Sequence, residues 1–137
     1  MVNLLTGPKG SGKTQQMIEL ANAQAKEVNG NVVFIKKTHR DTASVSFDIR
    51  TICLDDIPAI SNTDAYIGFL YGMSSANHDI ECVFIDALLK HADVTLETLP
   101  SFVEKLNKIT AECNIDFYVS VSADPADVAN IADCNLI

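Results

Sequence analysis

The sequence predicts an α/β fold, a three-layer sandwich with a mainly parallel central sheet, formed as a single domain by residues 1–137. Short apolar runs alternate along the chain with longer segments of helical periodicity, and strands that alternate with helices form parallel sheets. A glycine-rich turn joins the first apolar run directly to the first helical segment, as in many strand–turn–helix units. A chain of 137 residues can bury a core but leaves little room for a second domain.

The first half of the chain predicts strands on either side of one helix. Residues 2–6 are apolar and predict a buried strand, and residues 15–28, rich in alanine, predict a helix that an Asn-Gly pair ends. Residues 31–36 are again apolar and predict a second strand. The polar residues 37–48 lack periodicity and predict a loop, and residues 50–54 predict a short strand before a proline-containing break.

The second half of the chain continues this alternation. Residues 64–73 carry apolar side chains near helical spacing and predict a helix. Residues 82–86 predict another buried strand, and residues 98–113 predict an amphipathic helix with one apolar side. Residues 117–122 predict a further strand. The remaining expected elements are a helical stretch begun by an Asp-Pro pair, 124–130, and an edge strand, 135–137.

The glycine-rich turn is the most specific motif in the chain. It fits the pattern G-x-x-x-x-G-K-[ST] with every fixed position filled, by Gly7, Pro8, Lys9, Gly10, Ser11, Gly12, Lys13 and Thr14. Glycines let successive backbone N–H groups point at phosphate oxygens, and the helix that follows adds the positive end of its dipole. Lys13 would reach the β- and γ-phosphates, and the Thr14 hydroxyl would hold Mg²⁺. The motif therefore predicts that a nucleoside triphosphate binds in this loop.

A second candidate position is Asp86, at the end of the apolar run 82–86. Ligands of parallel α/β sheets lie at the carboxyl ends of the strands, so this carboxylate is expected near the glycine-rich turn. It would complete the Mg²⁺ site, commonly through a water molecule. We therefore expect Lys13 and Asp86 to be the catalytic residues, with Thr14 and Asp86 as the metal ligands.

With these Walker A and Walker B motifs, the chain resembles the P-loop NTPases over most of its length. Within that superfamily the layout is similar to the branch with an inserted strand, which includes RecA-like ATPases and thymidine-kinase-like proteins. The likeness rests on the strand 32–36 between the two motifs and on the polar strand 118–122 after the second. The ending 132–137 is also similar to the last sheet strand of RecA-like domains. It implies the P-loop NTPase fold, ATP rather than GTP, Mg²⁺ as cofactor, and ATP hydrolysis.

The chain departs from hydrolytic members of that branch directly after Asp86. Those proteins carry a glutamate there that activates water, whereas Ala87 and Leu88 follow here and the nearest acids downstream are Asp93 and Glu97. We therefore expect weak or partner-dependent ATP hydrolysis, with Asp93 and Glu97 as solvated loop acids or as acids that swing into the site. The alternatives are a nucleoside-kinase-like phosphotransferase and a non-catalytic switch or assembly subunit. Against the kinase, that family's zinc-binding cysteine cluster and Asp-Glu pair are absent from the sequence.

Some further polar residues are weaker candidates for binding. Ser120 and Ser122 could sense the γ-phosphate, and Ser122 is the better candidate because it lies nearer the carboxyl end of its strand. Cationic side chains flank the polar loop and would bind an anion, act as an arginine finger, or pair with Asp41 or Asp48. These cations are Lys37, His39, Arg40 and Arg50.

Composition limits the partners. The net charge is −8, with 10 Lys and Arg against 18 Asp and Glu, which argues against nucleic-acid binding. No apolar run approaches the about 18–20 residues of a membrane span, and a strand begins at residue 2, so we expect no leader peptide and a cytoplasmic location. The expected partners are the nucleotide and either a partner protein or a second copy of the chain.

The cysteine and histidine positions predict no metal site. Cys53, Cys82, Cys113 and Cys134 are far apart, and no Cys/His spacing indicates zinc, so they are expected to be small buried hydrophobic residues. His78 and His91 are expected in turns or at the surface.

Overall fold

The computed structural model describes residues 1–39 and 44–137. Its strands are β1 (Val2–Gly7), β2 (Asn31–Lys36), β3 (Ile49–Cys53), β4 (Ile80–Ile85), β5 (Asp116–Ser122) and β6 (Cys134–Leu136). Its helices are α1 (Lys13–Glu27), α2 (Thr63–Ala76), α3 (Leu99–Cys113) and the short α4 (Pro125–Val128), with the 3-10 turns η1 (Leu54–Asp56) and η2 (Leu88–Lys90).

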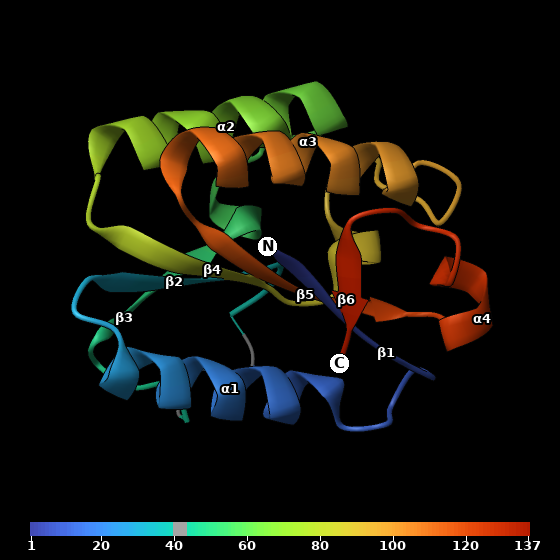
Figure 1. The fold of residues 1–137 in the computed structure, drawn as a ribbon, viewed down its shortest axis with the longest axis horizontal. Coiled ribbons are helices and arrows are strands. Elements are labelled where there is room, and N and C mark those ends of the chain that lie inside the picture. The colour runs from blue at the N-terminus through green and yellow to red at the C-terminus, as the bar shows by residue number, and fades with distance from the viewer. Residues whose placement is uncertain (40–43) are drawn as a thin grey trace.

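The strands form one open sheet in the order β3-β2-β4-β5-β1-β6. Every pairing between these strands is parallel, so their carboxyl ends meet at one edge of the sheet. Helix α1 covers one face of the sheet, and α2 and α3 lie side by side over the other (Figure 1). The α/β class and the parallel sheet flanked by helices are therefore confirmed.

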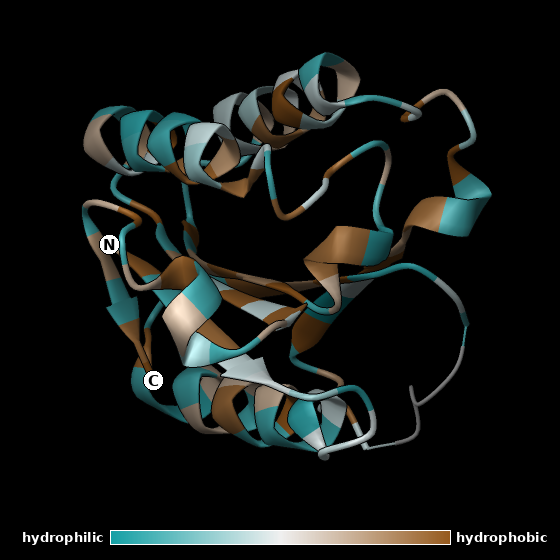
Figure 2. Ribbon diagram, turned by 90° about the vertical axis from the view of Figure 1, so that its right-hand side faces the viewer, coloured by the Kyte–Doolittle hydropathy of each residue, from teal (hydrophilic) through white to brown (hydrophobic). Residues whose placement is uncertain are grey.

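The core lies on both faces of the sheet, because helices cover both. On the α1 side, Phe84 stacks between Phe34 and Tyr118, with ring centroids 6.3 and 4.5 Å away. On the other side the ring of Tyr66 meets Phe102 edge-on, at 5.5 Å between centroids. Strands buried on both faces read as continuous apolar runs, which is why the sheet is the hydrophobic layer in Figure 2. Each large side chain buried in this way contributes about 1.5–3 kcal/mol.

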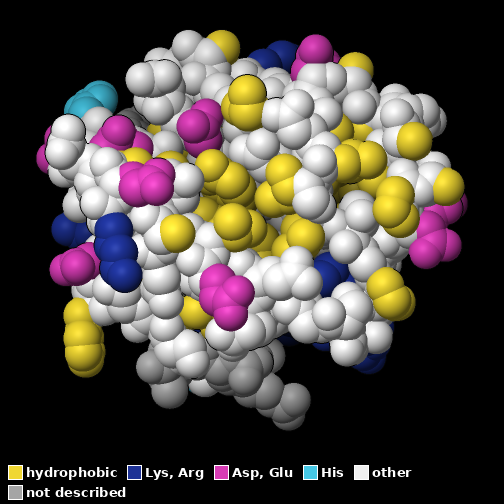
Figure 3. Space-filling model, turned by 60° about the horizontal axis from the view of Figure 1, so that its bottom comes forward, with side chains coloured by type: hydrophobic (Ala, Val, Ile, Leu, Met, Phe, Trp, Pro, Cys, Tyr) yellow, Lys and Arg dark blue, Asp and Glu magenta, His cyan; other side chains and the backbone are white. Residues whose placement is uncertain are grey.

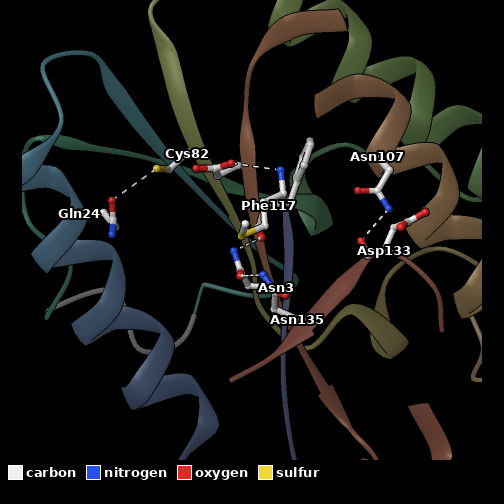
Figure 4. A network of polar contacts seen from close by, with 9 residues as sticks. Asn3, Gln24, Cys82, Asn107, Phe117, Asp133 and Asn135 are labelled. Atoms are coloured by element: carbon white, nitrogen blue, oxygen red, sulfur yellow. Dashed lines mark hydrogen bonds and ion pairs between the residues drawn. The ribbon is translucent and has the colours of Figure 1, made fainter. Parts of the chain in front are cut away.

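Asparagine side chains fasten the edge strand β6 to the sheet (Figure 4). Asn3 on β1 is buried, and its amide donates to the carbonyl of Phe117 at 3.3 Å. The amide of Asn135 donates to the side-chain oxygen of Asn3 at 3.3 Å. From α3, Asn107 donates to the Asp133 carbonyl at 3.0 Å, just before β6. Because a buried amide without partners is costly, these bonds favour this register of β6 on β1.

The helix expected at 124–130 and the edge strand expected at 135–137 differ in their bounds. Helix α4 ends at Val128, and the amide of Ile131 then closes a turn on the Val128 carbonyl at 3.1 Å. The edge strand begins one residue earlier than expected, because Cys134 pairs with Val2. Local propensity decides neither end, since the turn after α4 and the pairing with β1 set them.

The described part of the chain has no helix suited to a membrane, and it mixes its charges on the face shown in Figure 3. Within residues 1–39 and 44–137, no helix combines the length and apolar character needed to cross a bilayer. On the face shown in Figure 3, Lys and Arg side chains are scattered among acidic ones, and hydrophobic side chains gather near the middle.

Candidate functional site

The glycine-rich turn lies between β1 and α1, at the carboxyl edge of the sheet. Gly10 and Gly12 have φ values of 80° and 85°, in the left-handed region that favours glycine. At Gly7, a β-carbon would approach the Ser11 hydroxyl oxygen to 2.9 Å, so a side chain there would crowd the turn. No side chain caps the start of α1, which follows at Lys13. The first amide groups of α1 are therefore left for an anion, as at many phosphate-binding helix termini.

The Lys13 side chain folds back over the turn. Its ammonium donates to the backbone carbonyls of Gly7 and Pro8, at 3.0 and 2.8 Å. The residue is only 8% exposed. Burial lowers the pKa of Lys13, Asp86 opposes this shift, and Lys90 adds to it. These two hydrogen bonds thus fix the positive charge of Lys13 inside the turn.

Asp86 lies directly after β4 and is joined to two other elements. The Thr14 hydroxyl at the start of α1 donates to Asp86 Oδ2 at 2.9 Å, and the Ser120 hydroxyl on β5 donates to Asp86 Oδ1 at 2.8 Å. The Ala87 amide in turn donates to Ser120 Oγ at 2.7 Å. Ala87 has a φ of 57°, a left-handed conformation that costs alanine roughly 1–2 kcal/mol. The Ser120 hydroxyl therefore stabilises the Asp86 carboxylate by donating to it, and the strained backbone at Ala87 by accepting from its amide.

Two adjoining clefts open on this arrangement. One, of about 260 Å³, lies over the glycine-rich turn; its lining residues include Lys13, Asp86 and Ser122. The other, of about 230 Å³, lies beside it and runs toward the end of β2, with Lys36, Lys37 and Thr38 in its wall. Thr14, Asp86, Ala87 and Lys90 line both. Besides Asp86 and the apolar side chains of Ile18 and Phe34, the described residues lining the clefts bring mainly cations, hydroxyls and backbone amides, which suits an anion.

The residues present fit a polyphosphate with a hard divalent cation. Thr14 and Asp86 place a hydroxyl and a carboxylate oxygen 2.9 Å apart beside the buried ammonium of Lys13. Mg²⁺ prefers oxygen ligands of these types, and a lysine ammonium together with free helix amides suits phosphate oxygens. The predicted site residues Lys13, Thr14 and Asp86 thus lie together, although 72 residues separate Thr14 from Asp86.

Among the described residues lining the two clefts, Asp86 is the one acid. Asp93 instead accepts from the amide and hydroxyl of Thr63, at 2.7 and 2.8 Å, at the start of α2. Glu97 is exposed before α3. The expectation that either acid swings into the site therefore finds no support in this arrangement, and Asp93 is occupied as a helix-end acceptor.

The weaker candidates fall in different places. Ser120 and Ser122 both line the cleft over the glycine-rich turn, and Ser120, at 1% exposed, also bonds to Asp86. Arg50 is exposed on β3 and lines neither cleft. Lys37 and His39 pair with Asp55 and Asp56 in η1, at 2.9 and 2.8 Å. The proposed pairing of this cationic loop with Asp48 is thus not the one found in the described part of the chain, and Arg40 and Asp41 lie outside the described residues.

His91 was expected in a turn or at the surface; it follows the turn η2 but is buried. It is 1% exposed after η2, and its Nδ1 lies 2.9 Å from the Tyr66 hydroxyl of α2. The two rings also stack, with centroids 5.7 Å apart. Burial lowers the pKa of His91 to about 4, with the Asp86 backbone opposing the shift, so the ring is neutral near pH 7. The sequence does not reveal this contact, because Tyr66 and His91 are 25 residues apart and only the packing of α2 against the turn after β4 brings them together.

The four cysteines are all free thiols. Cys53 and Cys82 are buried, as expected, whereas Cys113 and Cys134 are only half-buried. Cys82 lies under α1, where its thiol is 3.8 Å from the Gln24 side-chain oxygen (Figure 4). Burial raises the pKa of Cys82 to about 11, which keeps this thiol protonated and unreactive.

Comparison with protein-family models and with curated protein sequences yields no match to this chain. Its function is therefore argued from the residues and geometry of the site.

Proposed function

We propose that this chain is a P-loop protein that binds ATP with Mg²⁺ at the carboxyl edge of its sheet and hydrolyses it weakly or only with a partner. The observation that carries the proposal is the contact between Thr14 and Asp86, 2.9 Å apart and brought together from two motifs. A chance match to the phosphate-binding pattern would have no reason to lie beside the acid of the second motif.

Each residue of the site has a distinct task in this proposal. Lys13 and the amides at the start of α1 bind the phosphates, and Thr14 and Asp86 ligate Mg²⁺. Mg²⁺, when bound, neutralises charge on the phosphate oxygens. Ser120 lines the cleft over the glycine-rich turn and is assigned a positioning role, because its hydroxyl donates to Asp86. Lys90 lines both clefts and adds positive charge there.

The sheet order supports the inserted-strand branch of the superfamily. Strand β5 lies between β1, which leads into the phosphate loop, and β4, which ends before Asp86. Strand β5, the polar strand after the second motif, is thus the inserted one. Strand β2, which lies between the two motifs in the sequence, is on the far side of β4 in the sheet. The polar residues of β5 are explained by the same position, since Ser120 lies next to the proposed metal ligand.

Weak or partner-dependent hydrolysis follows from the acids around the site. A general base must come within hydrogen-bond reach of the attacking water. Asp93, the nearest acid downstream, is bonded to Thr63, which also favours the second candidate function, a nucleotide-dependent switch or assembly subunit. A partner protein or second copy of the chain would supply the missing group in the first case and respond to the bound nucleotide in the second.

The test measures ATP affinity and phosphate release with and without Mg²⁺ for the wild type, Lys13→Ala and Asp86→Asn. Lys26→Ala is the matched control, because Lys26 is exposed in the last turn of the same helix. We expect Lys13→Ala to lose ATP binding with its circular dichroism spectrum kept, and Asp86→Asn to lose the Mg²⁺ dependence. Unchanged affinity in a folded Lys13→Ala protein contradicts the site.

The same assay separates the candidate functions. Slow phosphate release that Asp86→Asn abolishes identifies an ATPase. Tight binding without release identifies a switch or assembly subunit. Transfer of phosphate to an added nucleoside, rather than to water, would identify a kinase.

A further inference from the structure

Three potential metal ligands meet beside the two clefts, outside the proposed nucleotide site. His39 follows β2, Cys53 ends β3 and Asp56 ends η1. Their ligand atoms all lie within 4.8 Å of one another, and His39 Nε2 is 2.8 Å from Asp56 Oδ1. Strands β2 and β3 are parallel neighbours, with Lys36 opposite Cys53, so the ends of both strands come to one place. The sequence hides this cluster, because its members have no zinc-motif spacing.

These donors are of mixed chemical type. A thiolate, an imidazole and a carboxylate are the ligands that Zn²⁺ takes in proteins, whereas Mg²⁺ and Ca²⁺ prefer oxygen alone. Cys53 is 6% exposed and forms the floor of the cluster, while His39 and Asp56 are exposed above it. An exposed ion pair such as His39–Asp56 contributes little to stability by itself, so its stabilising effect does not account for the arrangement.

The spacing is close to what a tetrahedral ion needs. Zinc–ligand bonds of about 2.0–2.3 Å place neighbouring ligand atoms roughly 3.3–3.6 Å apart. The contact of 2.8 Å between His39 and Asp56 would open slightly, and the thiol would approach from within 4.8 Å. The side chains of His39 and Asp56 are exposed and can turn toward the buried Cys53 thiol, so the backbone need not move far.

We propose that His39, Cys53 and Asp56 form a surface zinc site with its fourth position occupied by water. On binding, the Cys53 thiol releases its proton to solvent and gives up its bond to the Lys37 carbonyl, now 3.1 Å long. His39 and Asp56 exchange their mutual hydrogen bond for bonds to the ion. No electron is transferred, and the proposal does not depend on nucleotide binding.

A bound zinc ion would restrict the motion of one wall of the cleft that runs toward the end of β2. The segment between β2 and His39 contributes Lys37 and Thr38 to that wall, and Lys37 is already tied to Asp55 at 2.9 Å. Fastening His39 to the ends of β3 and η1 would hold this short segment at both ends. The metal site is thus placed to order the side of the cleft that lies away from the phosphate loop.

The test titrates the full untagged chain with Zn²⁺ against a chromophoric chelator and with Co²⁺ by absorption spectroscopy. We expect one Zn²⁺ per chain and a thiolate-to-Co²⁺ charge-transfer band. Cys53→Ser should abolish that band, and Cys53→Ser, His39→Ala and Asp56→Asn should each weaken zinc binding at least about tenfold, since even outer-shell changes cost that much. His39→Ala, at an exposed position, keeps the test valid if Cys53→Ser fails to fold.

Matched controls exclude other sites. Cys113→Ser changes a half-buried cysteine and His78→Ala an exposed histidine, both outside the cluster, and both should keep the band and the affinity. Asp86→Asn should also keep them, which separates this site from the proposed Mg²⁺ site. Absence of a thiolate band in the wild type, or equal loss in Cys113→Ser and Cys53→Ser, overturns the proposal.

Discussion

Replacing His91 by asparagine should remove a specific part of the protein's sensitivity to acid. The ring is buried with a pKa of about 4, whereas an exposed histidine in the unfolded chain titrates near 6.5. Between these values the unfolded chain binds a proton that the folded chain does not. His91 therefore stabilises the fold above about pH 6.5, and this contribution is lost as the pH falls toward 4.

The size of this loss follows from the two pKa values. A difference of about 2.5 units, at about 1.36 kcal/mol each, corresponds to about 3 kcal/mol of unfolding free energy. In His91→Asn the side-chain amide takes the place of the ring nitrogen that faces the Tyr66 hydroxyl, so this hydroxyl keeps a hydrogen-bond partner. The variant should be less stable near pH 7, because the stacked ring is lost, but should lose less stability on acidification.

The assay is urea denaturation of the wild type, His91→Asn and His78→Asn at several pH values between about 7.5 and 4.5. Carboxylates titrate in all of these proteins, so the difference between their pH slopes isolates His91. His78 is exposed, so its variant should follow the wild type. Parallel curves for the wild type and His91→Asn would refute the reasoning, because they would mean that burial of the ring does not depress its protonation.

The remaining predictions concern the contacts around the site. Ser120→Ala should lower the unfolding free energy by about 2–4 kcal/mol, because Asp86 loses a charge-assisted bond and the Ala87 amide loses its acceptor. It should also weaken ATP binding more in Mg²⁺ than in EDTA, and an equal effect in both would argue against a positioning role. Asp93→Ala should cost about 1 kcal/mol in thermal denaturation through the start of α2, with ATP affinity unchanged. A loss of ATP turnover without a loss of stability would show instead that Asp93 works at the site.

Local patterns in the sequence were enough to predict the strands and helices and the place of the glycine-rich turn. The apolar runs become strands because both faces of the sheet are covered, and the apolar stripe of 98–113 becomes the buried side of α3. The eight residues of the loop are neighbours in the chain, so the turn needs little from the rest of the fold. Element ends were less well predicted, as α4 shows, because neighbouring turns decide them.

Contacts between distant segments could not be predicted in the same way. Ser122 was preferred over Ser120 as a γ-phosphate sensor from its place along the strand, and both residues line the cleft over the glycine-rich turn. The bond from Ser120 to Asp86 was not predicted, because it depends on β5 lying next to β4 in the sheet. His91 was expected in a turn or at the surface; its burial after the turn η2 was not predicted, because no neighbour in the sequence shows that α2 packs over it. Both outcomes depend on strand order and helix packing, which the whole core determines.

The sequence by itself therefore determined the alternation of strands and helices, the parallel sheet and the glycine-rich turn after the first strand, since each follows from residues close together along the chain. Only the tertiary structure decided that Asp86 meets Thr14, that Ser120 holds it, and that His39, Cys53 and Asp56 share one place. The physical reason is that parallel strands bring their carboxyl ends to a common edge, whatever the distance between them in the chain.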